Sequence, residues 1–264
     1  MVKINLKKLL AGVLVLTSFF SLGDDGSKPL IVTTIKPLAI IAATASNGNA
    51  AVRYIQSSAQ TTCDIYLSPL LTEKFSSADS VIRVSPIIET HLNKFFKRMS
   101  GLNLITASEL EMRWPASPNA GSNPGSLHRD LHFWLDPWNA NVLATEIQKR
   151  LGLKDNQIID SQLLATYQLT LRDYRDRTVI AHHDAFGHFA NAFSLKPFQS
   201  IRDTTGSIKG IASNYQLRAN AQANMPNCIL VEPQYQPRET KLLGSELQLP
   251  LNPIDLQGMS AKLT

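Results

Sequence analysis

Short apolar runs rich in β-branched residues alternate along this chain with stretches of helical periodicity. This alternation is typical of parallel sheets built from strand–helix units. In the first half, the pattern predicts strands at 30–35, 51–55, 80–85 and 103–106, and helices at 37–48, 69–78 and 87–99. Residues 114–126 are rich in Pro, Gly, Ser and Asn and show no periodicity, so we expect a loop there.

The second half repeats the pattern. Helical spacing persists from residue 137 to residue 176 across a break at Gly152, which fits one long connecting helix or two shorter helices. Beyond it we predict strands at 178–181, 198–201, 228–231 and 249–254, and helices at 184–193, 207–223 and 238–247. The expected fold is therefore α/β, with two lobes that are each a parallel sheet flanked by helices, joined by a long connecting helix. The expected boundaries are 24–136 for the N-terminal lobe, 137–176 for the connecting helix and 177–264 for the C-terminal lobe.

The first 23 residues have the pattern of a secretory signal peptide. Three lysines precede an apolar stretch over residues 9–22, and small residues follow at Ser21 and Gly23. The apolar stretch is shorter than the roughly 20 residues that a membrane-spanning helix needs. We therefore expect export and cleavage between Gly23 and Asp24, with an uncleaved N-terminal anchor as the alternative.

The charge of the chain gives no support for a nucleic-acid partner. The formal net charge of +5 falls to +2 once the three lysines of the signal peptide leave. Binding to nucleic acid usually needs a strongly basic surface. The remaining residues, roughly 240, are enough for two small lobes with real cores.

The chain has two cysteines, Cys63 and Cys228. In an exported protein such a pair is normally interpreted as a disulfide. Cys228 opens an apolar strand in the second half, whereas Cys63 lies at a polar turn in the first, so a bridge would join the two lobes. We expect instead a buried free thiol at Cys228.

Two histidine-bearing turns are the main chemical signal. In residues 179–189 an apolar strand runs into His182, His183 and Asp184, and residues 127–137 carry His128 and His132. Imidazoles at the end of a strand face a cleft and are good ligands for a metal ion. Because the two turns are far apart in sequence, they suggest one site built between two lobes.

These motifs resemble those of the zinc/manganese-type periplasmic solute-binding proteins of bacterial ABC metal importers, chiefly the zinc branch. The resemblance covers about residues 30–258 and rests on Ile31-Val-Thr-Thr-Ile-Lys-Pro-Leu38, the Cys63-to-Pro69 turn, His132-Phe-Trp-Leu-Asp-Pro137, His183-Asp-Ala-Phe-Gly187, Glu232-Pro-Gln-Tyr235 and the Asp255 turn. It implies two α/β lobes that hold a metal ion in the cleft between them. It also implies that the metal is delivered to a membrane permease.

The resemblance implies a set of metal ligands. It places two ligating histidines at His132 and His183 and an acidic ligand at Asp255, and it marks Glu232 as a supporting residue. Zn²⁺ prefers about four nitrogen, sulfur or oxygen ligands in a tetrahedron, so two histidines and one aspartate leave a position to fill.

The departure from the family lies at its first histidine ligand. The family has a His just before an Asp-Tyr-type turn, and this chain reads Thr61-Thr-Cys63-Asp64-Ile-Tyr there. Aligned without a gap, Cys63 takes the ligand position, and a thiolate suits Zn²⁺ or Cu⁺. With a short deletion, the ligand is lost and Cys63 is a bystander. The sequence leaves both alternatives open.

Other polar residues near the two turns have expected supporting or remote positions. By proximity in sequence, Asp136 and Asp184 are candidates to accept hydrogen bonds from the ligating imidazoles. Neighbouring residues of a strand point to opposite faces, so only one of His182 and His183 should reach the metal. His188 is expected to lie away from the site.

The sequence therefore predicts a zinc-binding protein of the periplasm that is not an enzyme and that works as a monomer with the permease of an ABC metal importer. Zn²⁺ is the expected cargo, with Mn²⁺ or Cu⁺ as alternatives. A degenerate relative with weak metal binding and an accessory role is a second hypothesis, since the first His is missing and only nine residues follow Asp255. A secreted zinc hydrolase is a third hypothesis, disfavoured because no His-Glu-x-x-His pattern occurs.

Overall fold

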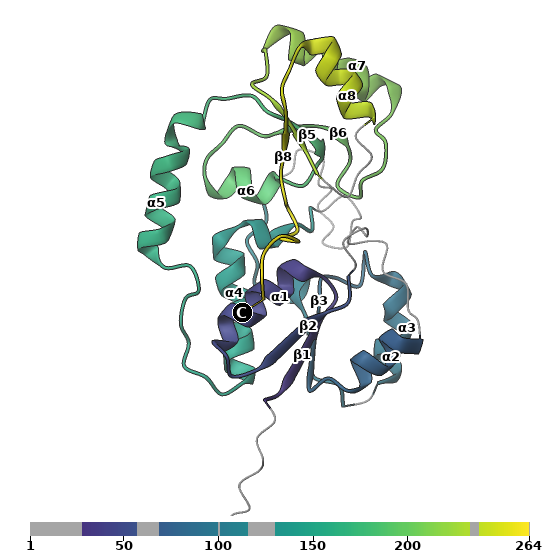
Figure 1. Ribbon diagram of the computed structural model, residues 1–264, viewed down its shortest axis with the longest axis vertical. Coiled ribbons are helices and arrows are strands. Elements are labelled where there is room, and N and C mark those ends of the chain that lie inside the picture. The colour runs from purple at the N-terminus through teal and green to yellow at the C-terminus, as the bar shows by residue number, and fades with distance from the viewer. Residues whose placement is uncertain (1–27, 57–68, 100, 116–129, 233–237, 264) are drawn as a thin grey trace, which may run out of the picture.

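The computed structural model describes residues 28–56, 69–99, 101–115, 130–232 and 238–263 (Figure 1). The predicted signal peptide, Cys63 and most of the predicted loop at 114–126 lie outside these ranges. No helix within them is long and apolar enough to cross a membrane.

The N-terminal lobe is built on a four-stranded parallel sheet of order β2-β1-β3-β4. Its strands are β1 (Leu30–Thr33), β2 (Ala51–Tyr54), β3 (Ser80–Arg83) and β4 (Leu104–Thr106), and its helices are α1 (Lys36–Ser46), α2 (Pro69–Ser76), α3 (Thr90–Arg98) and α4 (Pro137–Arg150). Side chains alternate across the sheet: Ile31 and Ile82 pack in the core with α1 and α4, whereas Val32 and Val81 pack with α2 and α3. Both faces are therefore covered, as a parallel sheet requires.

The C-terminal lobe repeats this architecture with the parallel order β6-β5-β7-β8. Its strands are β5 (Ile180–His183), β6 (Gln199–Arg202), β7 (Ile229–Val231) and β8 (Leu251–Pro253), and its helices are α6 (Gly187–Ala192), α7 (Ile211–Ala223) and α8 (Arg238–Leu247). Ile180 packs with Leu217 of α7 and Leu243 of α8, and Ala181 packs on the other face with Phe186. The predicted fold class of two parallel-sheet α/β lobes flanked by helices is confirmed.

Residues 137–176 form two separate helices, so the prediction of one long connecting helix is wrong. Helix α4 ends at Arg150, and α5 (Ser161–Leu171) follows after a stretch without helix. Gly152 adopts φ +65°, a left-handed conformation that stops the helix. The chain then turns back along α4, where the Asn141 amide binds both the N–H and the carbonyl of Ile159. Since α4 packs into the N-terminal core, only the later part of 137–176 links the lobes, and the predicted domain boundaries stay a prediction.

The segment after β8 also crosses between the lobes, running from the C-terminal lobe down onto α1 (Figure 1). The buried Lys36 ammonium donates to the carbonyl of Met259 at 2.8 Å and to that of Ala261 at 2.7 Å. Gln56 of the N-terminal lobe donates to the side chain of Gln257 at 2.6 Å. These bonds tie the C-terminal segment to the N-terminal lobe.

Cys228 has a free thiol, as predicted. It is half-buried rather than buried, because it lies one residue before the start of β7, at the end of the sheet where the strands begin. Its carbonyl accepts a hydrogen bond from Ile180.

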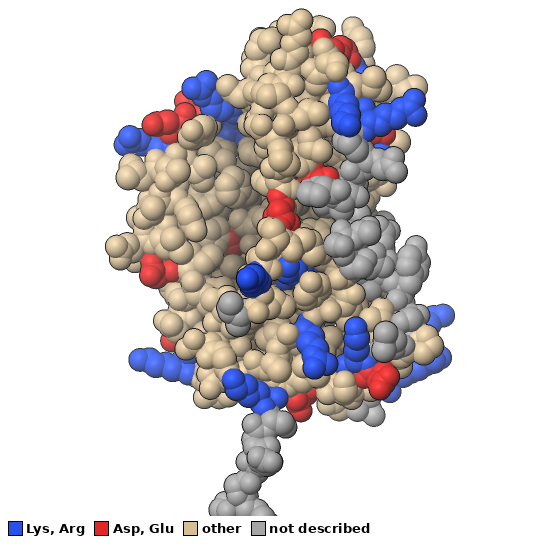
Figure 2. Space-filling view, viewed as in Figure 1, with Lys and Arg blue, Asp and Glu red and all other residues tan. Residues whose placement is uncertain are grey.

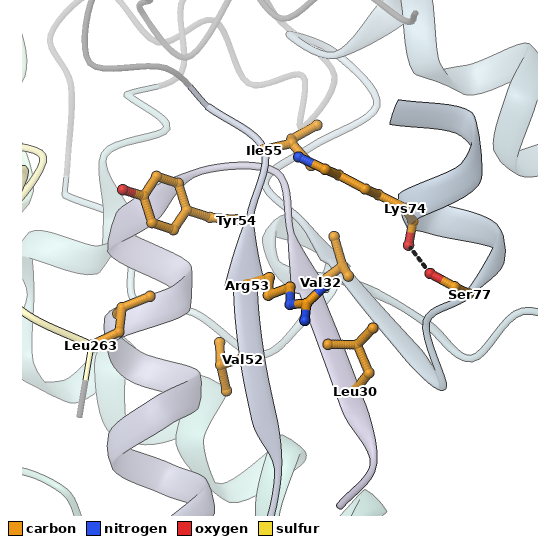
Figure 3. A pocket seen from close by; sticks show the side chains of 9 residues that line it. All are labelled: Leu30, Val32, Val52, Arg53, Tyr54, Ile55, Lys74, Ser77 and Leu263. Atoms are coloured by element: carbon orange, nitrogen blue, oxygen red, sulfur yellow. Dashed lines mark hydrogen bonds between the residues drawn. The ribbon is translucent and has the colours of Figure 1, made fainter. Parts of the chain in front are cut away.

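The surface of the lobes has two further features. Figure 2 shows Lys and Arg side chains spread over both lobes on this face, with Asp and Glu among them. A cavity of about 240 Å³ lies around the edge strand β2 (Figure 3). Its lining is largely apolar, with Arg53 and Lys74 as its cations, and it includes no histidine.

Glu89 is a buried carboxyl in the N-terminal lobe, near the carboxyl end of β3. It accepts a hydrogen bond from the Ser85 N–H at 2.9 Å. Burial raises the pKa of Glu89 to about 7 from an ordinary value of 4.5, although hydrogen bonds from the backbone oppose the shift. Between these two values the unfolded chain has lost the proton and the folded chain keeps it. The free energy of unfolding therefore falls as the pH rises through this window.

Glu89→Gln is expected to remove this pH dependence. The variant should gain on the order of 2 kcal/mol in free energy of unfolding relative to the parent as the pH rises from 5 to 8, because glutamine has no proton to lose. Urea denaturation of both proteins at several pH values, with a chelator present, measures the difference. Parallel pH profiles for parent and variant would contradict a raised pKa at this position.

Candidate metal centre

Strand register brings His183 and Glu232 together. In the parallel pair β5 and β7, Ile180 lies opposite Ile229 and Ala181 lies opposite Leu230. Continuing this register places His183, the last residue of β5, beside Glu232, the first residue after β7. Nδ1 of His183 is hydrogen-bonded to Oε1 of Glu232, and the two residues are only 2 % and 1 % exposed. The carboxyl ends of two adjacent strands thus supply an imidazole with a carboxylate behind it.

The alternation of the strand sends His182 to the opposite face. Its Nδ1 lies 2.6 Å from the hydroxyl of Thr240 on α8. Burial is the main cause of the lowered pKa of His182, and a neutral ring suits this position inside the lobe. His183 faces the junction of the lobes and His182 does not, and the strand pattern predicts that only one of the two can do so.

His132 reaches the same place from the N-terminal side. It precedes a single 3-10 turn, Phe133–Leu135, that leads into α4. Asp130 holds it twice, since Oδ1 accepts from the backbone N–H of His132 at 3.0 Å and lies 2.8 Å from its Nδ1. Burial raises the pKa of Asp130, but the hydrogen bonds and charge of His132 outweigh that effect and lower it. The carboxylate is therefore ionised and can only accept.

The Nε2 atoms of His132 and His183 lie 3.2 Å apart. Because each Nδ1 faces a carboxylate oxygen, each ring carries its proton on Nδ1 and leaves a lone pair on Nε2. Two lone pairs that face each other repel unless a cation lies between them. Two nitrogens bound at roughly 2.0–2.1 Å to a tetrahedral Zn²⁺ would be about 3.3 Å apart. The observed separation is therefore close to that of two ligands of one metal ion.

The other predicted ligands are not brought to this pair within the described residues. Asp255 is exposed, and its carboxylate accepts from the N–H of Met259 at 2.8 Å and from the N–H and hydroxyl of Ser260, both at 2.6 Å. In the described part of the chain, no three His, Cys, Asp or Glu residues form a group that could hold a metal ion. Asp255 and Cys63 as ligands stay predictions, the latter because it lies outside the described ranges.

The two aspartates that were candidates to support the imidazoles have other partners in the described hydrogen bonds and ion pairs. Asp136 instead caps α4 by accepting from the Trp138 N–H at 2.8 Å, and Asp184 pairs with the Lys209 ammonium at 3.6 Å. Burial raises the pKa of both aspartates. The supporting role belongs to Asp130 and, as the resemblance implied, to Glu232. The sequence Asp130-Leu-His132 was the pattern from which a hydrogen bond between Asp130 and His132 could have been predicted.

His188 lies closer to the histidine pair than the sequence predicts. It is fully buried, and its Nε2 lies 3.0 Å from the carbonyl oxygen of Asp130. No sequence pattern signals this contact, because it joins residues 58 positions apart.

Two parallel α/β lobes with a buried histidine from each side of their junction are the architecture of a two-lobed solute-binding protein for a metal ion. The family described as zinc-uptake complex component A, periplasmic (ZnuA) matches residues 31–262. The chain belongs to this family. It is a family of solute-binding transport proteins rather than of enzymes.

Curated relatives agree with this assignment. The chain is 25 % identical over 264 aligned residues to the high-affinity zinc uptake system protein ZnuA of Yersinia pestis, covering 87 % of this chain and 82 % of the relative. It is 31 % identical over 126 residues to ZnuA of Brucella abortus (strain 2308), covering 42 % of this chain and 37 % of that protein. The match thus spans little more than a third of the Brucella protein.

Solved structures share the fold. A crystal structure of ZnuA superposes with a TM-score of 0.73 at 16 % identity, covering 88 % of this chain and 92 % of that one. The AdcAII protein of Streptococcus pneumoniae gives a TM-score of 0.73 at 20 % identity, covering 88 % and 90 %. At these identities the likeness establishes the two-lobed fold alone.

Proposed function

We propose that this protein binds Zn²⁺ at the junction of its lobes and delivers it to the permease of an ABC importer, catalysing no reaction. The observation that supports this most directly is the pair of Nε2 atoms 3.2 Å apart, each on a ring whose Nδ1 is hydrogen-bonded to a carboxylate. Carboxylates behind metal-binding histidines fix the tautomer and increase the basicity of the ligand. The family supplies the context of zinc uptake.

The proposal includes location and partners. The name of the family describes a periplasmic component, and the signal-peptide pattern of the first 23 residues fits export to that compartment. We propose cleavage after Gly23 and a monomer that docks on the permease.

The donor set favours Zn²⁺ over Mn²⁺. Imidazole nitrogen suits Zn²⁺, whereas Mn²⁺ prefers carboxylate, carbonyl and water oxygens. Asp255 and Cys63 are the proposed further ligands. For Asp255 to join the histidines, its carboxylate must leave the Met259 and Ser260 groups that it now binds.

A competitive titration tests this function. The mature protein is titrated with Zn²⁺ against a chromophoric chelator, and the metal content of the protein as purified is measured alongside. We expect one Zn²⁺ per chain with a submicromolar dissociation constant, about −8 kcal/mol or stronger. Micromolar or weaker binding would instead favour the degenerate, accessory relative, which the lack of a third ligating residue in the described ranges supports. Metal-dependent cleavage of peptide or ester substrates would favour the hydrolase.

Alkylation tests Cys63 as a ligand. A coordinated thiolate is shielded from an alkylating reagent, so saturating Zn²⁺ should slow labelling of Cys63 at least tenfold, and a chelator should restore it. Cys228 is the internal control, since it is half-buried at the start of β7 and should label equally in both states. Mass spectrometry of the labelled peptides separates the two sites. Equal labelling of Cys63 with and without Zn²⁺ would exclude the thiolate from the metal centre.

A further inference from the structure

We propose that His188 is a positioning residue that orients His132 by holding Asp130 from the opposite lobe. His188 lies on α6 of the C-terminal lobe, and Asp130 precedes the turn that carries His132. His188 does not contact His132 itself in any described hydrogen bond. The consequence for metal affinity rests on the proposed function, but the orientation of His132 does not.

The partners of His188 define its tautomer. Nε2 lies 3.0 Å from the carbonyl oxygen of Asp130, which can only accept, so Nε2 carries the proton. Nδ1 lies 3.3 Å from Nδ2 of Asn139, which can only donate, so Nδ1 accepts. Asn139 is fixed in this orientation because its amide also binds both the N–H and the carbonyl of Arg113, at 2.7 and 2.9 Å. A neutral ring with one proton therefore satisfies both neighbours.

The surroundings of His188 bury it and favour its neutral form. The side chain is 0 % exposed, and the ring of Trp114 packs edge-on against it with centroids 5.3 Å apart. Burial is the main cause of the lowered pKa of His188, although Asp130 and Asp136 oppose it. A protonated ring would point Nδ1–H at the Asn139 amide hydrogens, which is unfavourable. These contacts thus favour the tautomer that donates to the carbonyl of Asp130.

Asp130 is fitted closely to α6. A Cβ added at Gly187 would lie 2.8 Å from Oδ2 of Asp130, so a glycine is needed for the carboxylate to approach the helix this closely. Oδ2 is buried and has no hydrogen-bond partner among the described residues, while Oδ1 takes both bonds from His132. The His188 bond to the Asp130 backbone and the space at Gly187 therefore contribute to the position of this carboxylate, together with its two bonds to His132.

This arrangement links the lobes through the metal centre. Asp130, Asn139 and Trp114 belong to the N-terminal side of the molecule, and His188 to the C-terminal lobe. If the lobes separate, the Asp130 turn loses its bond to His188, and His132 loses the carboxylate geometry that directs its lone pair at the metal. The geometry thus couples lobe closure to the quality of one ligand.

Three variants separate positioning from folding. His188→Phe keeps a ring against Trp114 but removes both hydrogen bonds. His188→Gln places an amide donor near the position of Nε2 and should rescue the bond to Asp130. Ala190→Gly, on the same helix, weakens α6 by about 1 kcal/mol without touching Asp130.

The first measurement uses the metal-free protein. In ¹H–¹⁵N spectra of the histidine rings, the Nδ1 proton of His132 should be protected from exchange with water by Asp130. We expect at least tenfold faster exchange in His188→Phe and protection near the parent's in His188→Gln and Ala190→Gly. Unchanged exchange in a folded His188→Phe overturns the proposal. If His188→Phe fails to fold, Gly187→Ala displaces the Asp130 carboxylate instead, and unchanged exchange there overturns the proposal equally.

The second measurement is the Zn²⁺ affinity of the same variants. Partners of metal-binding histidines typically contribute 10–100-fold, and we expect about tenfold weaker binding in His188→Phe with recovery in His188→Gln. A tenfold loss in Ala190→Gly as well would assign the effect to helix stability and overturn positioning. A parent that binds no Zn²⁺ overturns the proposed function, whereas faster exchange of the His132 proton in His188→Phe would still support the positioning role.

Discussion

Replacing His183 or His132 with Ala is expected to weaken Zn²⁺ binding by about a hundredfold or more in each case. Zinc sites with about four protein ligands have apparent binding free energies of roughly 10–16 kcal/mol, so one ligand is worth about 3 kcal/mol. The two losses should be comparable, because each imidazole contributes one Nε2 and each is backed by a carboxylate. Competitive titration of the two variants beside the parent measures the effect.

His182→Ala is the matched control for this experiment. It removes a buried imidazole from the adjacent position of the same strand, but one whose Nδ1 bonds to Thr240 rather than to Glu232. The variant should lose folding stability and retain Zn²⁺ affinity within about threefold, a change of less than 1 kcal/mol. If His182→Ala weakens binding as much as His183→Ala, the assignment of the ligand is wrong.

The sheet architecture and one half of the metal centre were accessible from the sequence because local rules determine them. β-branched runs predicted the strands, and the two-residue period predicted that only one of His182 and His183 faces the junction of the lobes, while the family resemblance selected His183. Parallel register then places Glu232 beside His183, since both lie at the carboxyl ends of paired strands. None of these steps needs knowledge of how the lobes pack.

Two of the predictions that failed depend on contacts between distant segments, and one depends on a local helix cap. The break at Gly152 left one helix or two possible, and the bonds from Asn141 to Ile159 that fold the chain back along α4 are tertiary. Asp136 was a plausible partner for His132 by proximity, but capping the Trp138 N–H at the start of α4 uses its carboxylate. His188 meets Asp130 only because α6 packs against the turn before α4.

Removing the charge of either carboxylate that is bonded to a histidine should weaken Zn²⁺ binding nearly as much as removing a ligand. Glu232→Gln and Asp130→Asn are both expected to weaken Zn²⁺ binding 10–100-fold, because an amide oxygen is a weaker acceptor than a carboxylate and its NH₂ can select the wrong imidazole tautomer. Glu239→Gln is the control, since that carboxylate pairs with Arg202 at 2.9 Å and touches neither histidine in any described bond. It should leave the affinity unchanged.

A double-mutant cycle shows whether each carboxylate acts through its own histidine. Glu232 is bonded to His183, so Glu232→Gln should have almost no further effect on Zn²⁺ affinity once His183 is Ala, yet should keep its full effect in His132→Ala. Asp130→Asn should show the opposite pairing, because its Oδ1 is bonded to His132. Additive losses for Glu232→Gln and His183→Ala would mean that the carboxylate contacts the metal or the fold independently. Either result would show that Glu232 does not act through His183, and the assignment of this carboxylate as the partner that orients His183 would be wrong.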